Sequence, residues 1–208
     1  MIPGRGIYYV IEGPDGMGKS TQVDMLCEAL RWKGQNPLRI SEPDEDFEVG
    51  RLLRKLLKSG EHVQSHPAMF LATRLTALPA KVVPALQAGR PVVSDRSFIS
   101  TLAYQSENWP LDWLYSLHAY LPAMPDTVVI LDMAPEKAME RRDKRPDEPE
   151  YYEKLGTQRR IRERYLELAR DQRLFNLLGW QNNSQVHIVD AEPSPQDVHS
   201  KVLWAVGL

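Results

Sequence analysis

The stretch EGPDGMGKST, residues 12–21, follows the apolar run GIYYVI at residues 6–11. It fits the pattern G-x-x-x-x-G-K-[ST] at Gly13, Gly18, Lys19 and Ser20. The glycines let the backbone curl so that successive N–H groups point at one phosphate, and a helix that starts at Lys19 adds the positive end of its dipole. The lysine ammonium reaches the terminal phosphates. The sequence therefore predicts a loop that binds a nucleoside triphosphate.

The phosphate contacts are expected along the whole loop. The predicted phosphate-binding residues are Gly13, Asp15, Gly16, Met17, Gly18, Lys19, Ser20 and Thr21. With average residue usage, such a pattern arises by chance in about one chain of this length in a hundred. Switches, motors and kinases all share this loop, so the loop alone leaves the reaction open.

The apolar run before the loop has no polar alternation, as expected for a strand buried on both faces. Four later runs share this character, at residues 38–40, 92–94, 128–131 and 186–189. Segments with helical periodicity lie between them, at residues 21–32, 52–57, 67–86, 135–145 and 158–173. Strands that alternate with helices predict an α/β fold of three layers, in which a five-stranded parallel sheet carries helices on both faces.

Length and composition limit the classes of protein. A chain of 208 residues, 42% of them hydrophobic, can bury one good core, so we expect a single domain over residues 1–208. The net charge of -2 gives no field that would draw the molecule to nucleic acid or to a membrane. With one cysteine, Cys27, no disulfide framework is possible. The chain shows no signal-peptide order and no apolar run of about 18 residues, so we expect a cytoplasmic protein.

Two charged regions fit the chemistry of a bound triphosphate. Asp95 and Arg96 end the run VVSDRS, so they lie at the carboxyl end of a predicted buried strand. There Asp95 would hold Mg²⁺ together with Ser20, and Arg96 would face the transferring phosphoryl group. The segment ERRDKRPDEPEYYEK, residues 140–154, is either a solvated surface loop or a mobile lid whose arginines close over phosphates.

The chain resembles the thymidylate kinases along nearly its whole length. EGPDGMGKST is similar to their phosphate loop, including the acidic residue Asp15, and the segments SEPDEDFEVGRLLRKLL, MFLATR and PALQAGRPVVSDRSFISTLAYQ follow in the family's order. The matching positions in these segments are Glu42, Pro43, Gly50, Arg54, Leu57, Phe70, Arg74, Ser100, Thr101, Tyr104 and Gln105. Phe70 and Arg74 lie one helical turn apart, so they share a face.

The resemblance implies a P-loop kinase fold with a short lid at about residues 141–154. The implied activity is Mg²⁺-dependent transfer of a phosphoryl group from ATP to dTMP, giving dTDP and ADP. It implies small-molecule nucleotides as partners, and a homodimer formed through helices, for which residues 67–86 and 109–120 are candidates. The implied catalytic residues are Lys19, Asp15, Arg96, Arg141 and Arg145. The implied acceptor-binding residues are Glu42, Arg54, Phe70, Arg74, Arg96, Thr101, Tyr104 and Gln105, with Phe70 stacking on the base and Arg74 binding the acceptor phosphate.

Several positions depart from the family pattern. Ser41 stands where the family has the arginine of R-E-P, and Ser97 stands where it has Tyr or His after D-R. Met17 puts no charge in the phosphate loop, so the lid arginines would have to supply it. These departures leave other acceptors open: a deoxynucleoside whose hydroxyl is deprotonated by Glu42, another or modified deoxynucleotide, or a modified base in DNA. A nucleotide-dependent switch is the remaining alternative, although the chain has no N-K-x-D guanine motif.

Overall fold

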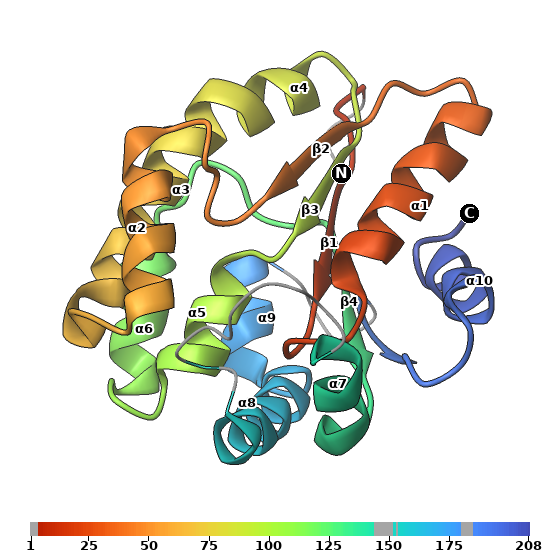
Figure 1. Ribbon diagram of the computed structural model, residues 1–208. Coiled ribbons are helices and arrows are strands. Elements are labelled where there is room, and N and C mark those ends of the chain that lie inside the picture. Colours follow the sequence, from red (N-terminus) through yellow and green to blue (C-terminus); the bar gives the residue numbers. More distant parts are fainter. Residues whose placement is uncertain (1–3, 144–151, 153, 180–184) are drawn as a thin grey trace.

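The computed structural model describes residues 4–143, 152, 154–179 and 185–208 (Figure 1). It contains one sheet of five parallel strands in the order β2-β3-β1-β4-β5. The strands are β1 (Tyr8–Glu12), β2 (Leu38–Ser41), β3 (Val92–Asp95), β4 (Thr127–Asp132) and β5 (Val186–Asp190). The predicted five-stranded parallel sheet is therefore confirmed, with each strand within a few residues of its predicted run.

Helices cover both faces of the sheet, and the reason is visible in β1. Successive side chains of a strand point to opposite faces, so Tyr8 and Val10 belong to one buried apolar cluster and Tyr9 and Ile11 to the other. The second cluster is covered by α1 (Lys19–Trp32), α7 (Pro135–Arg142) and α10 (Pro195–Ala205). The first is covered by α2 (Glu48–Ser59), α3 (His66–Ala77), η2 (Leu78–Val82), α4 (Val83–Gln87), α5 (Phe98–Gln105), α6 (Leu111–His118), α8 (Leu155–Leu168) and α9 (Gln172–Leu178).

The apolar segment predicted as one helix over residues 67–86 is a continuous helical run with a wide turn in it. The short 3₁₀ turn η1 (Val63–Ser65) leads into α3, and the π-helical η2 separates α3 from α4. Pro79 and Pro84 lie in this region, and each lacks the N–H that a regular α-helix needs. The run 63–87 is long and apolar enough to cross a membrane by length and composition. Part of this run packs inside the protein, because Thr73, Arg74 and Ala77 are buried and α3 contacts α2, α5 and α6.

One predicted helix is wrong in its extent. The charged stretch 158–173 was expected as a single helix, but α8 ends at Leu168 and α9 begins at Gln172. Asp171 causes the new start, because its side chain accepts a hydrogen bond of 2.9 Å from the backbone N–H of Arg173 and caps α9. The predicted helix at residues 135–145 is α7, which ends at Arg142. Of the predicted lid, residues 144–151 and 153 lie outside the described residues.

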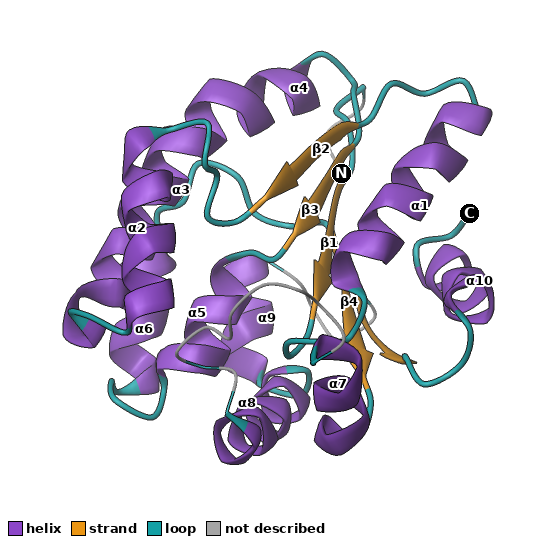
Figure 2. Cartoon of the chain, viewed as in Figure 1, coloured by secondary structure: helices purple, strands orange, loops and turns teal. Residues whose placement is uncertain are grey.

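The topology places the loops after β1, β2 and β3 at one edge of the sheet. In Figure 2 the arrowheads of these strands point to the same side, where the phosphate loop enters α1 and the chain after β3 enters α5. In the sheet β1 lies between β3 and β4, so the connections that lead to these two strands run to opposite sides of β1. A crevice at such a switch point, outside the carboxyl ends of parallel strands, is where ligands bind in this class of fold.

Candidate active site

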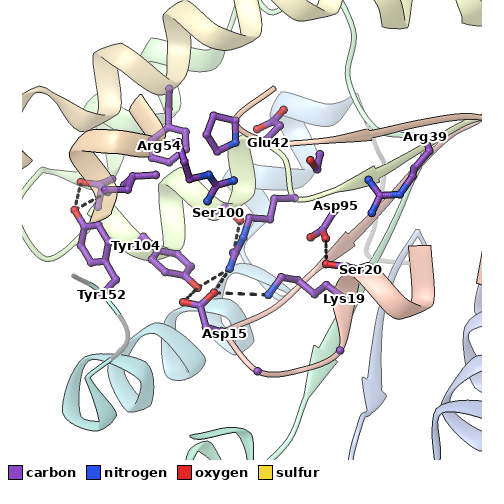
Figure 3. A pocket seen from close by; sticks show the side chains of 18 residues that line it. Asp15, Lys19, Ser20, Arg39, Glu42, Arg54, Asp95, Ser100, Tyr104 and Tyr152 are labelled. Atoms are coloured by element: carbon purple, nitrogen blue, oxygen red, sulfur yellow. Dashed lines mark hydrogen bonds and ion pairs between the residues drawn. The ribbon is translucent and has the colours of Figure 1, made fainter. Parts of the chain in front are cut away.

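A cavity of ≈ 310 Å³ opens at this edge of the sheet (Figure 3). Its lining comes from the phosphate loop, β2 and the turn after it, α2, α3, α5 and Tyr152. Twelve of the residues expected from the sequence line it: Asp15, Gly16, Gly18, Lys19, Ser20, Glu42, Arg54, Phe70, Asp95, Arg96, Tyr104 and Gln105. The structure thus brings the expected phosphate loop and most of the expected acceptor residues into one cavity.

The phosphate loop has the tight path that its glycines permit. Gly13 has φ 133° and Gly16 has φ 79°, a region that favours glycine. A Cβ at Gly13 would lie 2.4 Å from the Leu131 carbonyl oxygen, and one at Gly16 would lie 2.3 Å from that of Ala138. Any side chain at either position would push the loop away from β4 or α7. Both glycines are therefore required by close packing of the loop backbone as well as by its conformation.

Lys19 begins α1 with its ammonium inside the cavity. Its Nζ donates to the Pro14 carbonyl oxygen at 2.6 Å and lies 3.9 Å from Asp15 Oδ1. Burial lowers the pKa of Lys19 to about 8, and the positive charge of Arg96 acts in the same direction. Phosphate oxygens would reverse this effect, because negative charge near an ammonium favours its protonated form.

Asp15 is held from three sides. Its carboxylate accepts hydrogen bonds from Arg96, from the Tyr104 hydroxyl at 2.8 Å and from Gln158 Nε2 at 3.0 Å. Its backbone N–H donates to Gln158 Oε1 at 2.9 Å. Burial opposes the charge of this carboxylate, but Arg96 and Lys19 outweigh it and lower the pKa of Asp15. Asp15 is therefore a fixed anion that orients Arg96 and links the phosphate loop to α5 and α8.

Arg96 occupies an unusual backbone conformation at the junction of β3 and α5. Its φ is 76°, a left-handed value that is uncommon outside glycine and clusters at functional sites. The backbone N–H of Arg96 donates to the Ile11 carbonyl oxygen at 3.0 Å, and Ser94 Oγ donates to the Arg96 carbonyl oxygen at 2.6 Å. The guanidinium carbon lies 5.0 Å from the centroid of the Tyr104 ring. The turn thus aims the guanidinium back over the phosphate loop.

Ser20 and Asp95 meet at the same edge of the cavity. Ser20 Oγ donates to Asp95 Oδ2 at 2.5 Å, and both residues line the cavity. A hydroxyl oxygen and a carboxylate oxygen are the kinds of ligand that Mg²⁺ takes when phosphate oxygens and water complete its shell. Within the described part of the chain, no group of three His, Cys, Asp or Glu side chains forms a more complete metal site. The donor set at Ser20 and Asp95 therefore fits a magnesium ion that arrives with a nucleotide.

Arg74 lies beneath the acceptor side of the cavity and does not line it. The residue is 1% exposed. It donates to Glu42 Oε2 at 2.7 Å, Thr101 Oγ1 at 2.8 Å, the Ser97 carbonyl oxygen at 2.9 Å and His118 Nε2 at 3.0 Å. Its guanidinium carbon is 5.3 Å from the centroid of the Phe70 ring. Arg74 therefore braces Glu42 and Phe70, which do line the cavity, from below.

The other predicted residues are distributed as follows. The Met17 side chain points into the core with Val23, and only its backbone could reach a phosphate. Thr101 is fully buried as a partner of Arg74, and Thr21 is exposed on a neighbouring surface groove of α1. Arg141 donates to the carbonyl oxygens of Ala191 at 2.8 Å and Glu192 at 2.7 Å, in the loop after β5. Arg145 lies outside the described residues.

Glu12 is a central residue that the sequence analysis passed over. It is fully buried, and Oε1 accepts from the backbone N–H and the Oγ of Ser97, at 2.7 Å each. Oε2 accepts from Ser100 Oγ at 2.7 Å and from the Tyr165 hydroxyl at 2.8 Å. This carboxylate fastens the end of β1 to the start of α5 and explains Ser97, whose hydroxyl has a partner here. An acidic residue closing an otherwise apolar strand was the signal that could have identified it.

Three other residues were missed for different reasons. Gln158 holds Asp15 from α8, more than a hundred residues away in the sequence, and no local pattern indicates that contact. Tyr152 lines the cavity from within the charged segment that was considered only for its arginines. Arg39 also lines the cavity, and its position two residues before Ser41 on β2 puts both on the same face of the strand.

Comparisons with known proteins agree with this geometry. The family model described as "Thymidylate kinase" matches residues 11–202. A protein named "Probable thymidylate kinase" from Thermococcus gammatolerans is 35% identical, over 97% of this chain and 96% of its own. "Probable thymidylate kinase" of Pyrococcus abyssi is 31% identical with 97% and 96% coverage, and "Thymidylate kinase" of Halothermothrix orenii is 31% identical with 97% coverage of both chains. The chain therefore belongs to the thymidylate kinase family.

Proposed function

We propose that this protein transfers the γ-phosphoryl group of ATP to the phosphate of dTMP, giving dTDP and ADP, with Mg²⁺ as the cofactor. The observation that carries the proposal is one cavity that is lined both by Lys19, Ser20 and Asp95 and by Phe70 and Arg54. Family membership over residues 11–202 supports the same activity. No feature of the described residues favours a deoxynucleoside or DNA acceptor over the monophosphate.

The residues of the donor side would bind and neutralise the triphosphate. The loop N–H groups and the N-terminus of α1 bind phosphate oxygens, and the Lys19 ammonium balances the charge that develops on the transferring group. Ser20 and Asp95 would hold Mg²⁺, which when bound neutralises charge on the phosphate oxygens. An acceptor phosphate is already ionised, so the protein supplies alignment and positive charge without needing a general base.

The residues of the acceptor side would hold the nucleoside monophosphate in line. Phe70 offers an apolar ring for the base, and Arg54 and Arg96 offer guanidinium groups to its phosphate. Arg96 is aimed by the Asp15 carboxylate. We assign Arg74 a positioning role through Glu42, because all of its contacts given by the structure are to buried protein groups.

The lid cation is proposed from the sequence alone. Arg141 contacts the loop after β5, so we assign it to the donor nucleotide's side of the fold. Arg145 then is the proposed lid residue that contacts the transferring phosphoryl group. Replacing Arg145 with Ala should lower kcat with little change in the binding of either nucleotide.

The same proposal includes a soluble cytoplasmic homodimer of single-domain subunits. One sheet shared by both apolar clusters supports the single domain over residues 1–208. Leu52 and Leu75 support the dimer, because their exposed fractions are 52% and 50% on the adjacent helices α2 and α3. Ala72, Thr76 and Pro79 are exposed on the same run of helix as Leu75, so the α3 side of this face carries no charge, while the exposed Glu48 and Lys55 flank Leu52 on α2. An apolar centre with a charged rim is typical of a subunit interface.

The direct test is a panel of acceptors. Purified protein is incubated with ATP, Mg²⁺ and dTMP, dUMP, dCMP, dAMP, dGMP, thymidine or single-stranded DNA, and ADP release is measured. We expect turnover with dTMP well above the rate without acceptor, and loss of that turnover in Lys19→Met. ADP release that is equal with and without dTMP would refute the proposal. Turnover confined to thymidine or DNA would show that the acceptor is a nucleoside or DNA and that dTMP is not a substrate.

A further inference from the structure

Arg39 is a basic side chain of the cavity that none of the functions described above uses. It lies on β2 and lines the cavity together with Ser41, Ser20 and Asp95. Figure 3 shows its guanidinium extending from β2 toward Asp95. The side chain is 38% exposed, so a ligand in the cavity can reach it.

The register of the sheet explains how Arg39 comes to this place. In the parallel pairing of β2 with β3, Arg39 lies opposite Val93 and Ser41 lies opposite Asp95. Val93 belongs to the apolar cluster that α1 covers. Because side chains two residues apart on a strand share a face, Arg39, Ser41 and Asp95 all lie on the α1 face of the sheet. Ser41 is nearer the end of β2 but short, so the longer Arg39 side chain can extend past it toward the cavity.

Arg39 is held at one edge of its guanidinium group. Its Nε donates to Asp24 Oδ1 at 2.6 Å, and Asp24 lies one helical turn after Ser20 on α1. The terminal nitrogens, Nη1 and Nη2, donate to no residue in the described part of the chain. The hydrogen bond to Asp24 raises the pKa of Arg39 above its usual range, and the negative charge of Asp95 acts in the same direction. Asp24 thus fixes the direction of the guanidinium and leaves its terminal N–H groups available to a ligand.

The position of β2 in the sheet assigns Arg39 to the acceptor side of the cavity. β3 separates β2 from β1, whose loop is assigned to the donor phosphates. The chain that follows β2 supplies Glu42 and Arg54 to the cavity. A phosphate monoester carries a charge of about −1.5 to −2 at neutral pH, and a guanidinium can bind its oxygens through two parallel hydrogen bonds. The acceptor group that suits Arg39 is therefore a phosphate.

We propose that Arg39 is a further binding residue for the phosphate of the acceptor nucleotide, which its terminal N–H groups contact beside Ser41. The inference rests on the proposed transfer to a nucleoside monophosphate and adds a residue to its acceptor site. The chain that has no arginine at position 41 carries one at position 39, on the same face of the same strand. The alternative is a surface ion pair with Asp24, whose side chain is 61% exposed, and the test separates the two.

The test compares the binding of dTMP and thymidine, which differ only in the phosphate. Calorimetry gives both dissociation constants for the parent protein, Arg39→Met and the control Arg31→Met. Arg31 is an exposed arginine of α1 that lines the neighbouring groove and not the cavity. The exchange variant Arg39→Met, Ser41→Arg returns a guanidinium to the same face of β2, two residues further along the strand.

We expect Arg39→Met to bind dTMP about 10-fold more weakly and thymidine unchanged, because the lost hydrogen bonds join two charged groups that are partly exposed. The KM for dTMP should rise in proportion while the KM for ATP stays the same. Arg31→Met should match the parent protein, and the exchange variant should regain part of the lost affinity. The effect should shrink as the salt concentration rises.

Three results would overturn the role of Arg39. Equal losses of affinity for dTMP and thymidine would show a structural effect, and unchanged affinity for dTMP would leave only the surface ion pair. A raised KM for ATP with an unchanged KM for dTMP would place Arg39 on the donor side. Melting temperatures show that the variant is folded, which we expect because an exposed ion pair contributes little to stability.

The two proposals fail separately. A parent protein that binds dTMP but does not phosphorylate it would refute the proposed function alone. If the acceptor panel identifies another nucleoside monophosphate, that nucleotide and its nucleoside take the place of dTMP and thymidine in the same comparison. An acceptor that is not a nucleoside monophosphate would refute the role of Arg39 as well.

Discussion

Arg74 and Glu42 form a buried ion pair, and its disruption should destabilise the protein in a pH-dependent way. Arg74 is 1% exposed and Glu42 is 8% exposed, with 2.7 Å between Nε and Oε2. Replacing Arg74 with Met leaves a buried carboxylate without its counter-charge, which typically costs about 3–5 kcal/mol of unfolding free energy. Domains have about 5–15 kcal/mol in total, so the variant should unfold at much lower urea concentration.

The pH dependence follows from the protonation of Glu42. Burial raises the pKa of Glu42 and Arg74 opposes that rise, so removing Arg74 raises the pKa further. A carboxyl group with a raised pKa stays protonated in the folded protein while it is ionised in the unfolded chain, so the folded state binds more protons. The free energy of unfolding then decreases as pH rises from the pKa of Glu42 in the unfolded chain through its pKa in the folded protein, by up to about 1.4 kcal/mol per pH unit. The loss of unfolding free energy in Arg74→Met should therefore be larger at pH 8 than at pH 5.5.

The assay is urea unfolding followed by circular dichroism at the two pH values. The double variant Arg74→Met, Glu42→Leu should recover most of the deficit at pH 8, because no buried charge remains. Arg159→Met is the matched control: its partner Glu136 is also an ion-pair carboxylate, but the two side chains are 57% and 49% exposed, and we expect no measurable change. A deficit that is the same at both pH values, or is not relieved in the double variant, would refute the reasoning.

Three further predictions concern the donor site and the subunit interface. With the pKa of Lys19 at about 8 in the unliganded protein, ATP binding at pH 8.5 should take up protons, seen as a buffer-dependent heat in calorimetry; equal uptake in Lys19→Met would contradict this assignment. Asp95→Asn should lower kcat by about 100-fold or more and raise the Mg²⁺ concentration for half-maximal rate; an unchanged Mg²⁺ dependence would exclude Asp95 as a ligand. Leu75→Glu should convert a dimer to a monomer in sedimentation, while Trp204→Glu on α10, where Trp204 is 80% exposed, should not; a dimer in both would place the interface elsewhere.

Local patterns were enough to predict the sheet and the phosphate loop. Residues 6–11 and 92–94 are short apolar runs bounded by breakers, and their order along the chain with helices between them leaves few arrangements besides a parallel sheet. The phosphate loop is equally local, because its glycines, Lys19 and Ser20 act within one turn of chain. The break at Asp171 was missed because a capping residue in a charged stretch does not interrupt its periodicity.

The sequence by itself determined the fold class, the phosphate loop and the strand end that carries Asp95 and Arg96, because each depends on residues close together in the chain. Only the tertiary structure decided what those residues contact. It turned Arg74 inward onto Glu42, brought Gln158 to Asp15 and sent Arg141 to the loop after β5. Such contacts join segments far apart in sequence, and they depend on the packing of helices against the sheet, which no local pattern of residues encodes.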